Sequence, residues 1–329
     1  MSKMRKKFCV IGDMIVDHYR IIEPTRISPE APVLIFGLRK EYKVPGGAGN
    51  VANNLLGLLG GKGDVVICSI VGHDWDEVAG RDHDFLPCRK VLVKNPSRRT
   101  TVKERLVTSR QQVARIDLQQ IGHHDPELVD ELCALALAEV RDSDAVILSD
   151  YDHGVMSPGL VRPIIAYAES VGVPVVVDSK SPDTVSKYSG STIALPTKQE
   201  IQHFIGMSRE DLAGGDEDLA VAVLERMSLQ AVGMTMGKDG IFLASRDAKP
   251  ERYPALAEDP ENDVVDVAGA GDTVTATVAL CLAHLTGFAE AIMLANVAAG
   301  TVVLKSGVVA ASGDEVGRIA ASRGIRWPI

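Results

Sequence analysis

The feature that most restricts the fold of this 329-residue chain is a regular alternation of strand and helix patterns between residues 125 and 244. It opens with Asp125 as predicted N-cap and Pro126 at the first position of a helix that runs to about Val140. More elements follow: strands at Ala145–Leu148, Pro174–Val177, Ile193–Leu195, Ala231–Met236 and Ile241–Ala244, and helices at Pro158–Val171, Lys198–Ile205 and Leu219–Ser228. Such alternation predicts a doubly wound α/β fold, with a mostly parallel sheet and helices on both faces.

The N-terminal part of the chain adds to this sheet. Phe8–Gly12 and Val65–Val71 are predicted to be buried strands, and Gly46–Gly60 is the first long helix. Two further strands are expected at Val33–Leu38 and Glu41–Val44. They follow a polar segment whose prolines exclude a continuous helix.

Residues 98–118 differ from the rest, because polar and apolar residues alternate there as in antiparallel strands with one wet face. Together with the strands near 33–44, they are expected to fold over the carboxyl edge of the sheet as a small β lid. We see no linker, repeat or low-complexity tract, and we expect one domain over residues 1–329 with this lid inserted. The polar-faced strands at 33–44 have another face to bury, which favours a homodimer.

The charge and the apolar runs argue against two classes of partner. Lysine and arginine number 35 against 44 aspartates and glutamates, and the net charge of −9 disfavours nucleic acid or an anionic membrane. The longest apolar runs, Val274–Leu285 and Ala291–Leu304, are shorter than the roughly 20 residues of a membrane span, so we expect buried helices. Five scattered cysteines without a CxxC pair indicate reduced thiols in a cytoplasmic protein.

The stretch from Val264 to Thr273 carries the clearest chemical signal. A short strand is expected to run into Gly269-Ala270-Gly271, where small residues let backbone N–H groups converge on an anion. A helix that begins near Asp272 adds the positive end of its dipole to that concavity. Asp272 then stands where a carboxylate can take a proton from an attacking hydroxyl. The alternative is an aspartate that only caps a buried helix after a glycine turn.

Several polar residues follow predicted strands and are expected to line one crevice at the carboxyl edge of the sheet, where such sheets bind ligands. These are Asp13, Asp150, Asp178 and Thr235-Met236-Gly237. Asp13 and Asp17 are candidate metal ligands or sugar-hydroxyl acceptors, with a strand-end cap and a surface residue as the alternatives. A basic stripe on the predicted lid is a solvated face or, over the crevice, a site for a phosphorylated substrate; it comprises Lys103, Arg105, Arg110 and Arg115.

Small residues open the first long helix, at Gly46-Gly47-Ala48-Gly49-Asn50, and let a ligand approach the backbone. Asn50 offers a donor and an acceptor to a hydroxyl-rich ligand. The same stretch contains Gly47-x-Gly49-x-x-Ala52, a loose dinucleotide fingerprint that leaves a nicotinamide (NAD) dehydrogenase as a remote alternative. The Walker pattern GxxxxGK[ST] is absent, which argues against a P-loop NTPase.

Together these motifs resemble those of the ribokinase-like (PfkB) carbohydrate kinases. The resemblance spans nearly the whole chain in order and rests on Gly46-Gly47…Asn50, Thr235-Met236-Gly237…Gly240 and Gly269-Ala270-Gly271-Asp272. Further segments are similar to the heptose 7-phosphate kinase domain of bacterial ADP-heptose synthesis enzymes: residues 27–33 (ISPEAPV), 45–52 (PGGAGNVA), 148–151 (LSDY), 265–273 (VDVAGAGDT) and 295–300 (ANVAAG). Residues 27–33 are the most specific of these.

The resemblance implies that ATP phosphorylates D-glycero-D-manno-heptose 7-phosphate at its anomeric hydroxyl. It implies that Asp272 is the base and that an anion hole for the γ-phosphoryl group is formed by Gly269, Ala270 and Gly271. The implied sugar-binding residues are Asp13, Gly46, Gly47 and Asn50, and further candidates on that side are Lys103, Arg105, Asp150 and Lys180. On the ATP side the residues are Thr197, Glu200, Thr235, Gly237, Gly240 and Asn296. Mg²⁺ would accompany ATP, with Glu200 acting through water, and Asp266 would help to hold a monovalent cation such as K⁺.

Three departures from the usual family pattern bear on the substrate and the metal geometry. Thr197 replaces the Asn of Pro-Asn-x-x-Glu, Ser179 replaces the Pro of Asp-Pro-Lys, and Ala268 stands where Thr is common. They favour, as a second interpretation, another sugar or sugar-phosphate kinase of the same superfamily. A non-catalytic sugar-binding protein is disfavoured, because Asp272 is retained. Since the chain ends at Ile329 without a nucleotidyltransferase-like domain, we expect kinase activity only.

Overall fold

The computed structural model describes residues 5–80, 85–109, 111–181, 183–204, 215–255, 266–305 and 307–329. Within these residues a nine-stranded sheet has the order β13-β12-β11-β10-β9-β8-β1-β4-β5. The bounds are β1 (Lys6–Gly12), β4 (Gly63–Gly72), β5 (Arg89–Asn95), β8 (Ala145–Asp150), β9 (Val175–Ser179), β10 (Ile193–Ala194), β11 (Ala231–Thr235), β12 (Ile241–Ser245) and β13 (Ala248–Tyr253). Neighbours from β5 to β11 are parallel, and β12 and β13 are antiparallel. The predicted mostly parallel sheet is confirmed.

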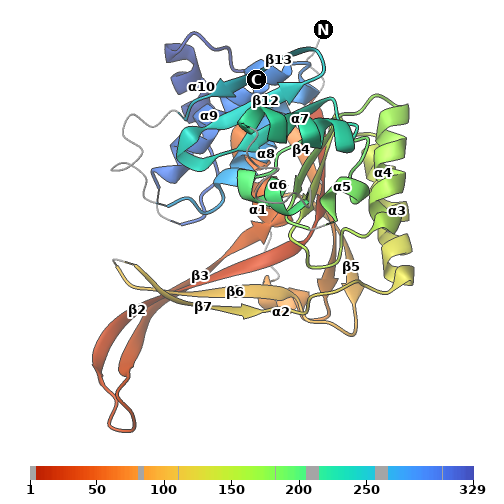
Figure 1. Cartoon of the computed structure of the whole chain (residues 1–329). Coiled ribbons are helices and arrows are strands. Elements are labelled where there is room, and N and C mark those ends of the chain that lie inside the picture. The colour runs from red at the N-terminus through yellow and green to blue at the C-terminus, as the bar shows by residue number, and fades with distance from the viewer. Residues whose placement is uncertain are drawn as a thin grey trace.

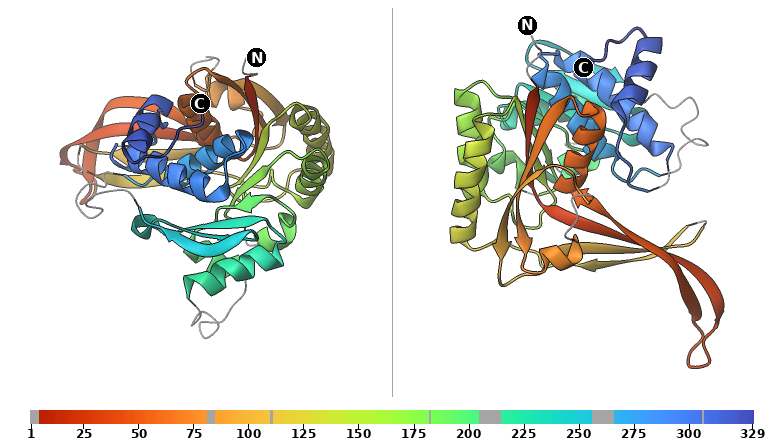
Figure 2. Two further views of the ribbon diagram at one scale, coloured as in Figure 1. Left: turned by 90° about the horizontal axis from the view of Figure 1, so that it is seen from above. Right: turned by 180° about the vertical axis from the view of Figure 1, so that it is seen from behind.

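Helices cover both faces of this sheet, as predicted (Figure 1, Figure 2). One face carries α1 (Ala48–Leu59), α8 (Ala270–Ala283), α9 (Phe288–Val303) and α10 (Gly313–Ser322). The other carries α3 (Pro126–Val140), α4 (Pro158–Ser170) and α7 (Asp216–Arg226). Short helical segments lie in the connections: α2 (Trp75–Val78), α5 (Thr184–Lys187), α6 (Lys198–Phe204) and a 3-10 turn at Gly237–Asp239. Among the helices so described, none is long and apolar enough to cross a membrane.

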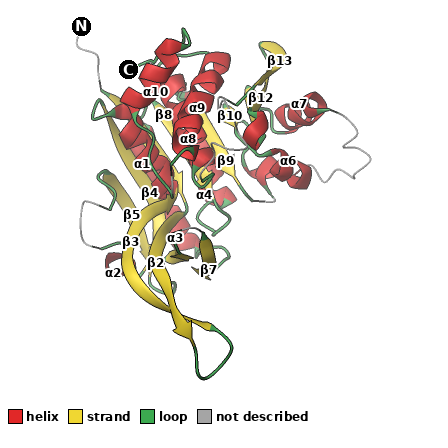
Figure 3. Cartoon of the chain, turned by 90° about the vertical axis from the view of Figure 1, so that its left-hand side faces the viewer, coloured by secondary structure: helices red, strands yellow, loops and turns green. Residues whose placement is uncertain are grey.

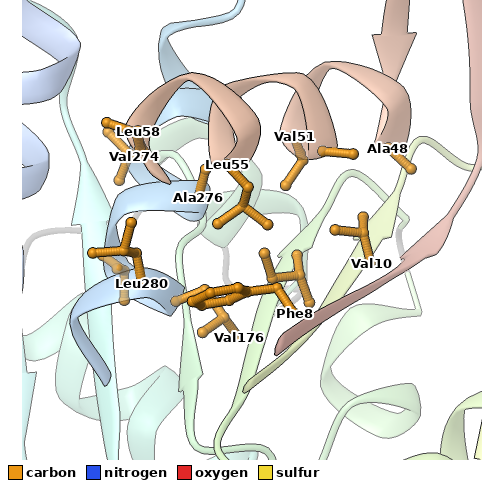
Figure 4. Close-up of a cluster of buried hydrophobic side chains, with 14 of the residues drawn as sticks. Phe8, Val10, Ala48, Val51, Leu55, Leu58, Val176, Val274, Ala276 and Leu280 are labelled. Carbon is orange, nitrogen blue, oxygen red and sulfur yellow. The ribbon is translucent and has the colours of Figure 1, made fainter. Parts of the chain in front are cut away.

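The first strand shows why a continuous apolar run marks the centre of such a sheet. Phe8 and Val10 point into the core beneath α1 and α8, whereas the alternate residues Cys9 and Ile11 pack on the α3 and α4 side. Figure 4 shows Phe8 and Val10 beneath the apolar faces of α1 and α8. Because both faces of β1 are covered, none of its central side chains can be polar. This packing fixes the two helices whose first turns carry Asn50 and Asp272.

Residues of the expected lid form a second sheet of four strands, in the order β3-β2-β6-β7. Its strands are β2 (Met14–Ile27), β3 (Leu34–Gly47), β6 (Thr101–Val107) and β7 (Gln112–Leu118). The β2–β3 hairpin projects away from the α/β body (Figure 1, Figure 3). The antiparallel pair predicted within 98–118 is confirmed by the β6–β7 register.

The expected pairing of Val33–Leu38 with Glu41–Val44 is wrong. Both belong to the single strand β3, which pairs with β2, a strand that the sequence pattern missed. The sequence pattern missed β2 because of Pro24, which lies between two register shifts in the part of β2 that pairs with β3 alone, beyond the last residue paired with β6. Gly46 and Gly47 end β3 and do not belong to the helix that follows.

Smaller differences concern ends of elements. The sequence patterns did not predict strand β5, strand β13 or helix α10. The Asp125 side chain makes no capping hydrogen bond, although its backbone oxygen starts α3. Of the strand expected before Gly269, Val264 and Val265 lie outside the described residues, and Asp266 and Val267 are in a loop. Ile205 also lies outside them. The single domain over residues 1–329 stays a prediction.

Asn54 joins the two helices that frame the site. Its Oδ1 accepts hydrogen bonds from the Thr273 hydroxyl of α8 at 2.8 Å and from the Ala311 backbone at 3.0 Å, and its Nδ2 donates to the Asn50 carbonyl at 2.9 Å. Asn54 is fully buried, so these bonds have no water to replace them.

We expect Asn54→Ala to lower the free energy of unfolding by roughly 2–4 kcal/mol, because Thr273 and Ala311 each lose an acceptor inside the core. Chemical denaturation of the purified variant measures this. Asn53→Ala, on the same helix but partly exposed, is the matched control and should change stability by less than about 0.5 kcal/mol. Equal losses in the two variants would contradict this role of Asn54.

Candidate active site

Asp272 lies in the first turn of α8, with its carboxylate between three segments far apart in the sequence. The side-chain amide of Asn50, in the first turn of α1, donates to Oδ2 at 2.6 Å. The hydroxyl of Tyr151, directly after β8, donates to Oδ1 at 2.6 Å. Gly269, and not Asp272, occupies the N-cap position, so the alternative of a simple helix cap does not fit this geometry.

The environment of Asp272 suits a proton acceptor. Burial raises the pKa of this carboxyl above its ordinary value, whereas the Lys180 charge and the hydrogen bonds from Tyr151 and Asn50 lower it. A raised pKa strengthens a carboxylate as a base, and the opposing donors keep it ionised.

The turn before Asp272 requires glycine and presents free amides. Gly269 has φ 82°, and a Cβ there would stand 2.7 Å from Nδ2 of Asn50. The amides of Gly271 and Asp272 precede the first amide that donates within the helix, that of Thr273 to the Gly269 carbonyl, so they are available to an anion at the positive end of α8. The Ala270 amide is partly engaged, because it donates to the Val267 carbonyl at 3.3 Å.

An apolar cavity of about 450 Å³ opens on one side of this turn. The residues predicted for the ATP side line it, with the exception of Glu200: Thr197, Thr235, Gly237, Gly240 and Asn296. Ile241, Val274 and Val303 make its walls apolar, which suits a flat heterocyclic base. Gly271 also lines it, so the cavity reaches the residue that precedes Asp272.

Asp13 and Asp150 lie at strand ends as expected, but their carboxylates bond to the protein itself. Asp13 accepts backbone hydrogen bonds from Tyr151, His153 and Val155 at 2.8, 3.3 and 3.1 Å. Burial, and next the charge of Asp150, raise the pKa of Asp13 to about 7 against these three donors.

Asp150 is paired with the Lys187 ammonium at 2.7 Å and accepts from the Tyr188 hydroxyl at 2.7 Å, with Ser179 and the Asp152 amide completing its contacts. Both carboxylates thus anchor the loop that follows β8. On Asp13, Oδ1 accepts only the Val155 amide and keeps a lone pair, so the predicted contact with a sugar hydroxyl stays a prediction, as does that of Asp150.

Gly46 and Gly47 are needed for packing inside the chain. A Cβ on Gly46 would lie 2.3 Å from an Asp17 carboxylate oxygen, and one on Gly47 would lie 2.4 Å from the Asp13 carbonyl. The strand before them, β3, belongs to the small sheet, and β1 leads into β2 instead of a helix. The dinucleotide fingerprint needs a core strand, a glycine turn and a helix, so the dehydrogenase interpretation has no structural basis.

Three cationic side chains are the candidates for the sugar side of the site. Arg105 pairs with the buried Asp17 at 2.6 Å. Lys103 lies two residues before Arg105 on β6, and its register partners are Asp17 on β2 and Asp117 on β7. Lys180 holds its ammonium 3.4 Å from the Tyr151 ring centroid. In the described part of the chain, Lys103 and Lys180 have no carboxylate within 4.0 Å, so both can attract an anion; Arg110 lies outside the described residues.

Asp178, at the end of β9, is a buried carboxylate that no hydrogen-bond donor contacts within the described residues. Burial raises its pKa to about 7 despite the Lys180 charge, and the nearby charges of Asp272 and Glu200 act in the same direction as burial. No cluster of three or more metal-ligating side chains occurs in the described ranges. A carboxylate without donors next to Glu200 nevertheless fits a hydrated divalent cation shared with a nucleotide.

Thr197 and Glu200 bond to each other. The Thr197 amide donates to Glu200 Oε2 at 2.7 Å, and the Glu200 amide donates to the Thr197 hydroxyl at 3.1 Å. This reciprocal pair is a capping box at the start of α6. It leaves one carboxylate oxygen of Glu200 for a hydrated cation.

The Asp266 carboxylate joins two loops, accepting from the Ala268 amide at 2.9 Å and the Gly307 amide at 3.0 Å. The carboxylate thus holds the two loops against each other, and its part in a monovalent-cation site stays a prediction.

Two residues of the site were not identified from the sequence. Tyr151 had no assigned role, and Asp17 was left between a surface residue and a ligand. The sequence feature that could have identified Tyr151 is its position directly after the end of a predicted strand, next to Asp150. Asp17 lies within a continuous run of buried residues at the start of β2, but that strand was not recognised.

The fold and the site define a carbohydrate kinase of the ribokinase-like kind. The chain belongs to the pfkB family of carbohydrate kinases, whose family model matches residues 5–314. It is 38% identical over 316 residues to the bifunctional protein HldE of Caulobacter sp. (strain K31), and it is 36% identical over 312 residues to that of Campylobacter fetus. These matches cover 93% of this chain in each case, and 61% and 65% of the relatives. The chain thus spans less than two thirds of the length of these relatives.

Solved structures show the same fold. Phosphofructokinase-2 from Escherichia coli, in complex with potassium, superposes with a TM-score of 0.73 at 16% identity, covering 98% of this chain and 100% of that one. Arabidopsis thaliana ribokinase, complexed with ribose and ATP, gives a TM-score of 0.66 at 20% identity, with 96% and 99% covered. These likenesses establish the architecture, and the sugar substrate has to be argued from the site.

The Asp178 carboxylate predicts a pH-dependent stability. Because its folded-state pKa of about 7 exceeds the ordinary value, the stability from holding its proton is complete below about pH 4 and lost as the pH rises through 7. Asp178→Asn should therefore be more stable than wild type at pH 8, by on the order of 1–4 kcal/mol, with little difference at pH 4.

Urea denaturation from pH 4 to pH 8 measures this difference. The control is Asp183→Asn, an exposed aspartate five residues away, which should follow the wild-type curve. A constant gain for Asp178→Asn at every pH would mean that ionisation of the carboxyl is not its cause.

Proposed function

We propose that this protein transfers the γ-phosphoryl group of ATP to the anomeric hydroxyl of D-glycero-D-manno-heptose 7-phosphate. One observation carries the proposal: the Asp272 carboxylate stands between the apolar cavity that Gly271 lines and a polar side with Lys103 and Lys180. The similarity of residues 27–33, 148–151 and 265–273 to heptose kinases supports this sugar, as do relatives named HldE.

In the proposed reaction the sugar lies on the polar side, and ATP occupies the apolar cavity. Oδ1 or Oδ2 of Asp272 takes the proton of the anomeric hydroxyl, since each oxygen has a lone pair beyond the one bonded to Tyr151 or Asn50. The sugar oxygen attacks the γ-phosphorus, and the bond to the β-phosphate oxygen breaks to release ADP. The amides of Gly271 and Asp272, with Ala270 and Gly269, stabilise the charge on the transferred group.

The remaining assignments follow the charges of the site. Asp178 and Glu200 hold Mg²⁺ through water, and that ion neutralises phosphate charge when bound. Asp266 shapes the K⁺ loops. Asn50 contacts the sugar as well as the base. The proposal includes a cytoplasmic location, which free and scattered cysteines favour.

The substrate's own phosphate is assigned to Lys103 and Lys180. Lys103 is half-buried, and burial lowers its pKa, so an anionic partner there is favourable. Arg105 is already paired with Asp17, and this pair shapes the crevice for any sugar. The second candidate remains another sugar kinase of the family, because Ser179 and Thr197 depart from the usual motif on the metal side.

A panel of sugars tests the proposal directly. With ATP and Mg²⁺, turnover is expected with D-glycero-D-manno-heptose 7-phosphate and, at a much higher KM, with the unphosphorylated heptose, but not with ribose, fructose or fructose 6-phosphate. Asp272→Asn should lower kcat by roughly 10²–10⁴-fold, because the proton acceptor is lost, while ATP binding persists. Turnover with a different sugar would move the function to the second candidate.

The same assay distinguishes the role of Lys103 from that of Arg105. Lys103→Ala should raise KM for a phosphorylated sugar by about tenfold, which is the loss of one charge-assisted bond. Arg105→Ala is the matched control and should impair phosphorylated and unphosphorylated sugars alike. Equal effects of Lys103→Ala on both kinds of sugar would remove the phosphate assignment.

A homodimer through the small sheet is the second part of the proposal. Apolar side chains are exposed on it: Ile27, Val33, Leu34, Leu38, Ile116 and Leu118. A second copy of this chain suits this surface, because the segment most similar to heptose kinases, residues 27–33, lies at the tip of the projecting β2–β3 hairpin (Figure 1). Apolar surface of this kind favours association.

We expect light scattering to give twice the chain mass over a concentration series. Leu34→Glu combined with Leu38→Glu should give the chain mass, because buried carboxylates would oppose the contact. Leu285→Glu is the control, since Leu285 is exposed at the end of α8, outside the small sheet. A wild-type protein that stays monomeric at every concentration would end the dimer proposal.

A further inference from the structure

We propose that Tyr151 is a positioning residue for the catalytic base: its hydroxyl orients the Asp272 carboxylate and keeps it ready to accept a proton. The inference rests on the proposed function in that it takes Asp272 as the base. Tyr151 itself need not contact the sugar or ATP.

The first observation is the bond itself. The Tyr151 hydroxyl lies 2.6 Å from Oδ1 of Asp272, which is short for a neutral donor and typical of a bond to an ionised acceptor. Asn50 holds the other oxygen at the same distance. Two donors on two different oxygens fix the rotation of the carboxylate, which a single donor would leave free. The lone pairs that remain then have a defined direction toward the incoming hydroxyl.

The second observation is that Tyr151 is itself held from behind. Its amide donates to Asp13, and Asp13 also accepts from the amides of His153 and Val155. Asp150 accepts from the amide of Asp152, the next residue. Hydrogen bonds from backbone amides to two buried carboxylates thus fix the backbone around Tyr151. A side chain on such a loop can place its hydroxyl with little variation.

The third observation concerns charge. The exposed Lys180 ammonium lies over the face of the Tyr151 ring, 3.4 Å from its centroid, where the ring quadrupole attracts a cation. Burial raises the pKa of Asp272. Of the effects that lower it, the Lys180 charge is the largest and the Tyr151 hydrogen bond is the next. Both depend on the tyrosine, one through its hydroxyl and the other through its ring. Tyr151 therefore opposes the tendency of burial to protonate the base.

The decisive experiment is the pH profile of kcat/KM for Tyr151→Phe. The variant loses the hydroxyl and keeps the ring. Without its donor the base should protonate at higher pH, so kcat/KM should fall roughly five- to tenfold near pH 6 and approach wild type near pH 8.5. A loss by the same factor at every pH would overturn the proposal, since that is what general disturbance of the site produces.

Tyr188→Phe is the matched control. Its hydroxyl donates to Asp150 at 2.7 Å, so the substitution removes a similar tyrosine–carboxylate bond that does not involve the base. In this variant the acid limb of the kcat/KM profile should lie at the same pH as in wild type, even if the substitution lowers the stability of the protein. An equal displacement in Tyr188→Phe would contradict a specific role for Tyr151.

A second variant distinguishes loss of the hydrogen bond from misfolding. Site-specific 3-fluorotyrosine at position 151 has a more acidic hydroxyl on nearly the same shape, so the acid limb should move to lower pH, opposite to Tyr151→Phe. No movement in that variant would count against the hydrogen bond.

Titration of the Asp272 carboxyl by ¹³C NMR, assigned by the signal missing in Asp272→Asn, gives a readout without turnover. Should wild type phosphorylate no sugar, the kinase proposal fails while this titration still decides on Tyr151. An Asp272 titration unchanged by Tyr151→Phe would overturn the positioning role.

Discussion

The buried carboxylate of Asp272, with one donor on each oxygen, is the interaction on which the rest of the site depends. It joins the first turn of α8, the first turn of α1 and the loop after β8. Each segment is fixed separately: Asn54 ties α1 to α8, Asp13 and Asp150 hold the loop, and the core beneath α1 and α8 fixes the helices. The geometry of the base thus follows from packing across the whole sheet.

This arrangement concentrates negative charge where burial is least favourable to it. Asp13, Asp178 and Asp272 all lie at the carboxyl edge of the parallel strands or beside it, and burial raises the pKa of each. Asp13 is compensated by backbone amides, whereas Asp178 has no hydrogen-bond donor in the described ranges. Under the proposed function, a carboxylate that is costly in the free protein would become useful once a nucleotide-bound cation reaches it.

The small sheet contributes a different kind of chemistry. Its inner positions bring Asp17, Lys103 and Arg105 to the crevice, while its outer positions leave apolar side chains exposed. One sheet can do both because successive residues of a strand point to opposite faces. Under the proposed function, the same strands would serve substrate recognition and association between copies, and a change of register would disturb both.

The sequence by itself determined the architecture and singled out Asp272 as the candidate base. Alternating strands and helices, the glycine turn before Asp272 and the order of the motifs depend on local periodicity and backbone freedom, which are visible in one dimension. It also placed Thr235, Gly237, Gly240 and Asn296 on one side, and the cavity brings these residues together. It failed at β2, because Pro24, which is tolerated where the strand has a single neighbour, gave this segment the pattern of a loop.

Only the tertiary structure decided which polar groups are already bonded. Asp13 and Asp150 were predicted to face the sugar, and in the fold their carboxylates also accept hydrogen bonds from amides and side chains up to 142 residues away along the chain. Tyr151 looked like an ordinary loop residue until its hydroxyl met Asp272, 121 positions further on. A hydrogen bond between distant segments leaves no periodic trace in the sequence. The pattern can therefore name residues at a strand end, but the fold alone decides whether each one meets the substrate or supports a residue that does.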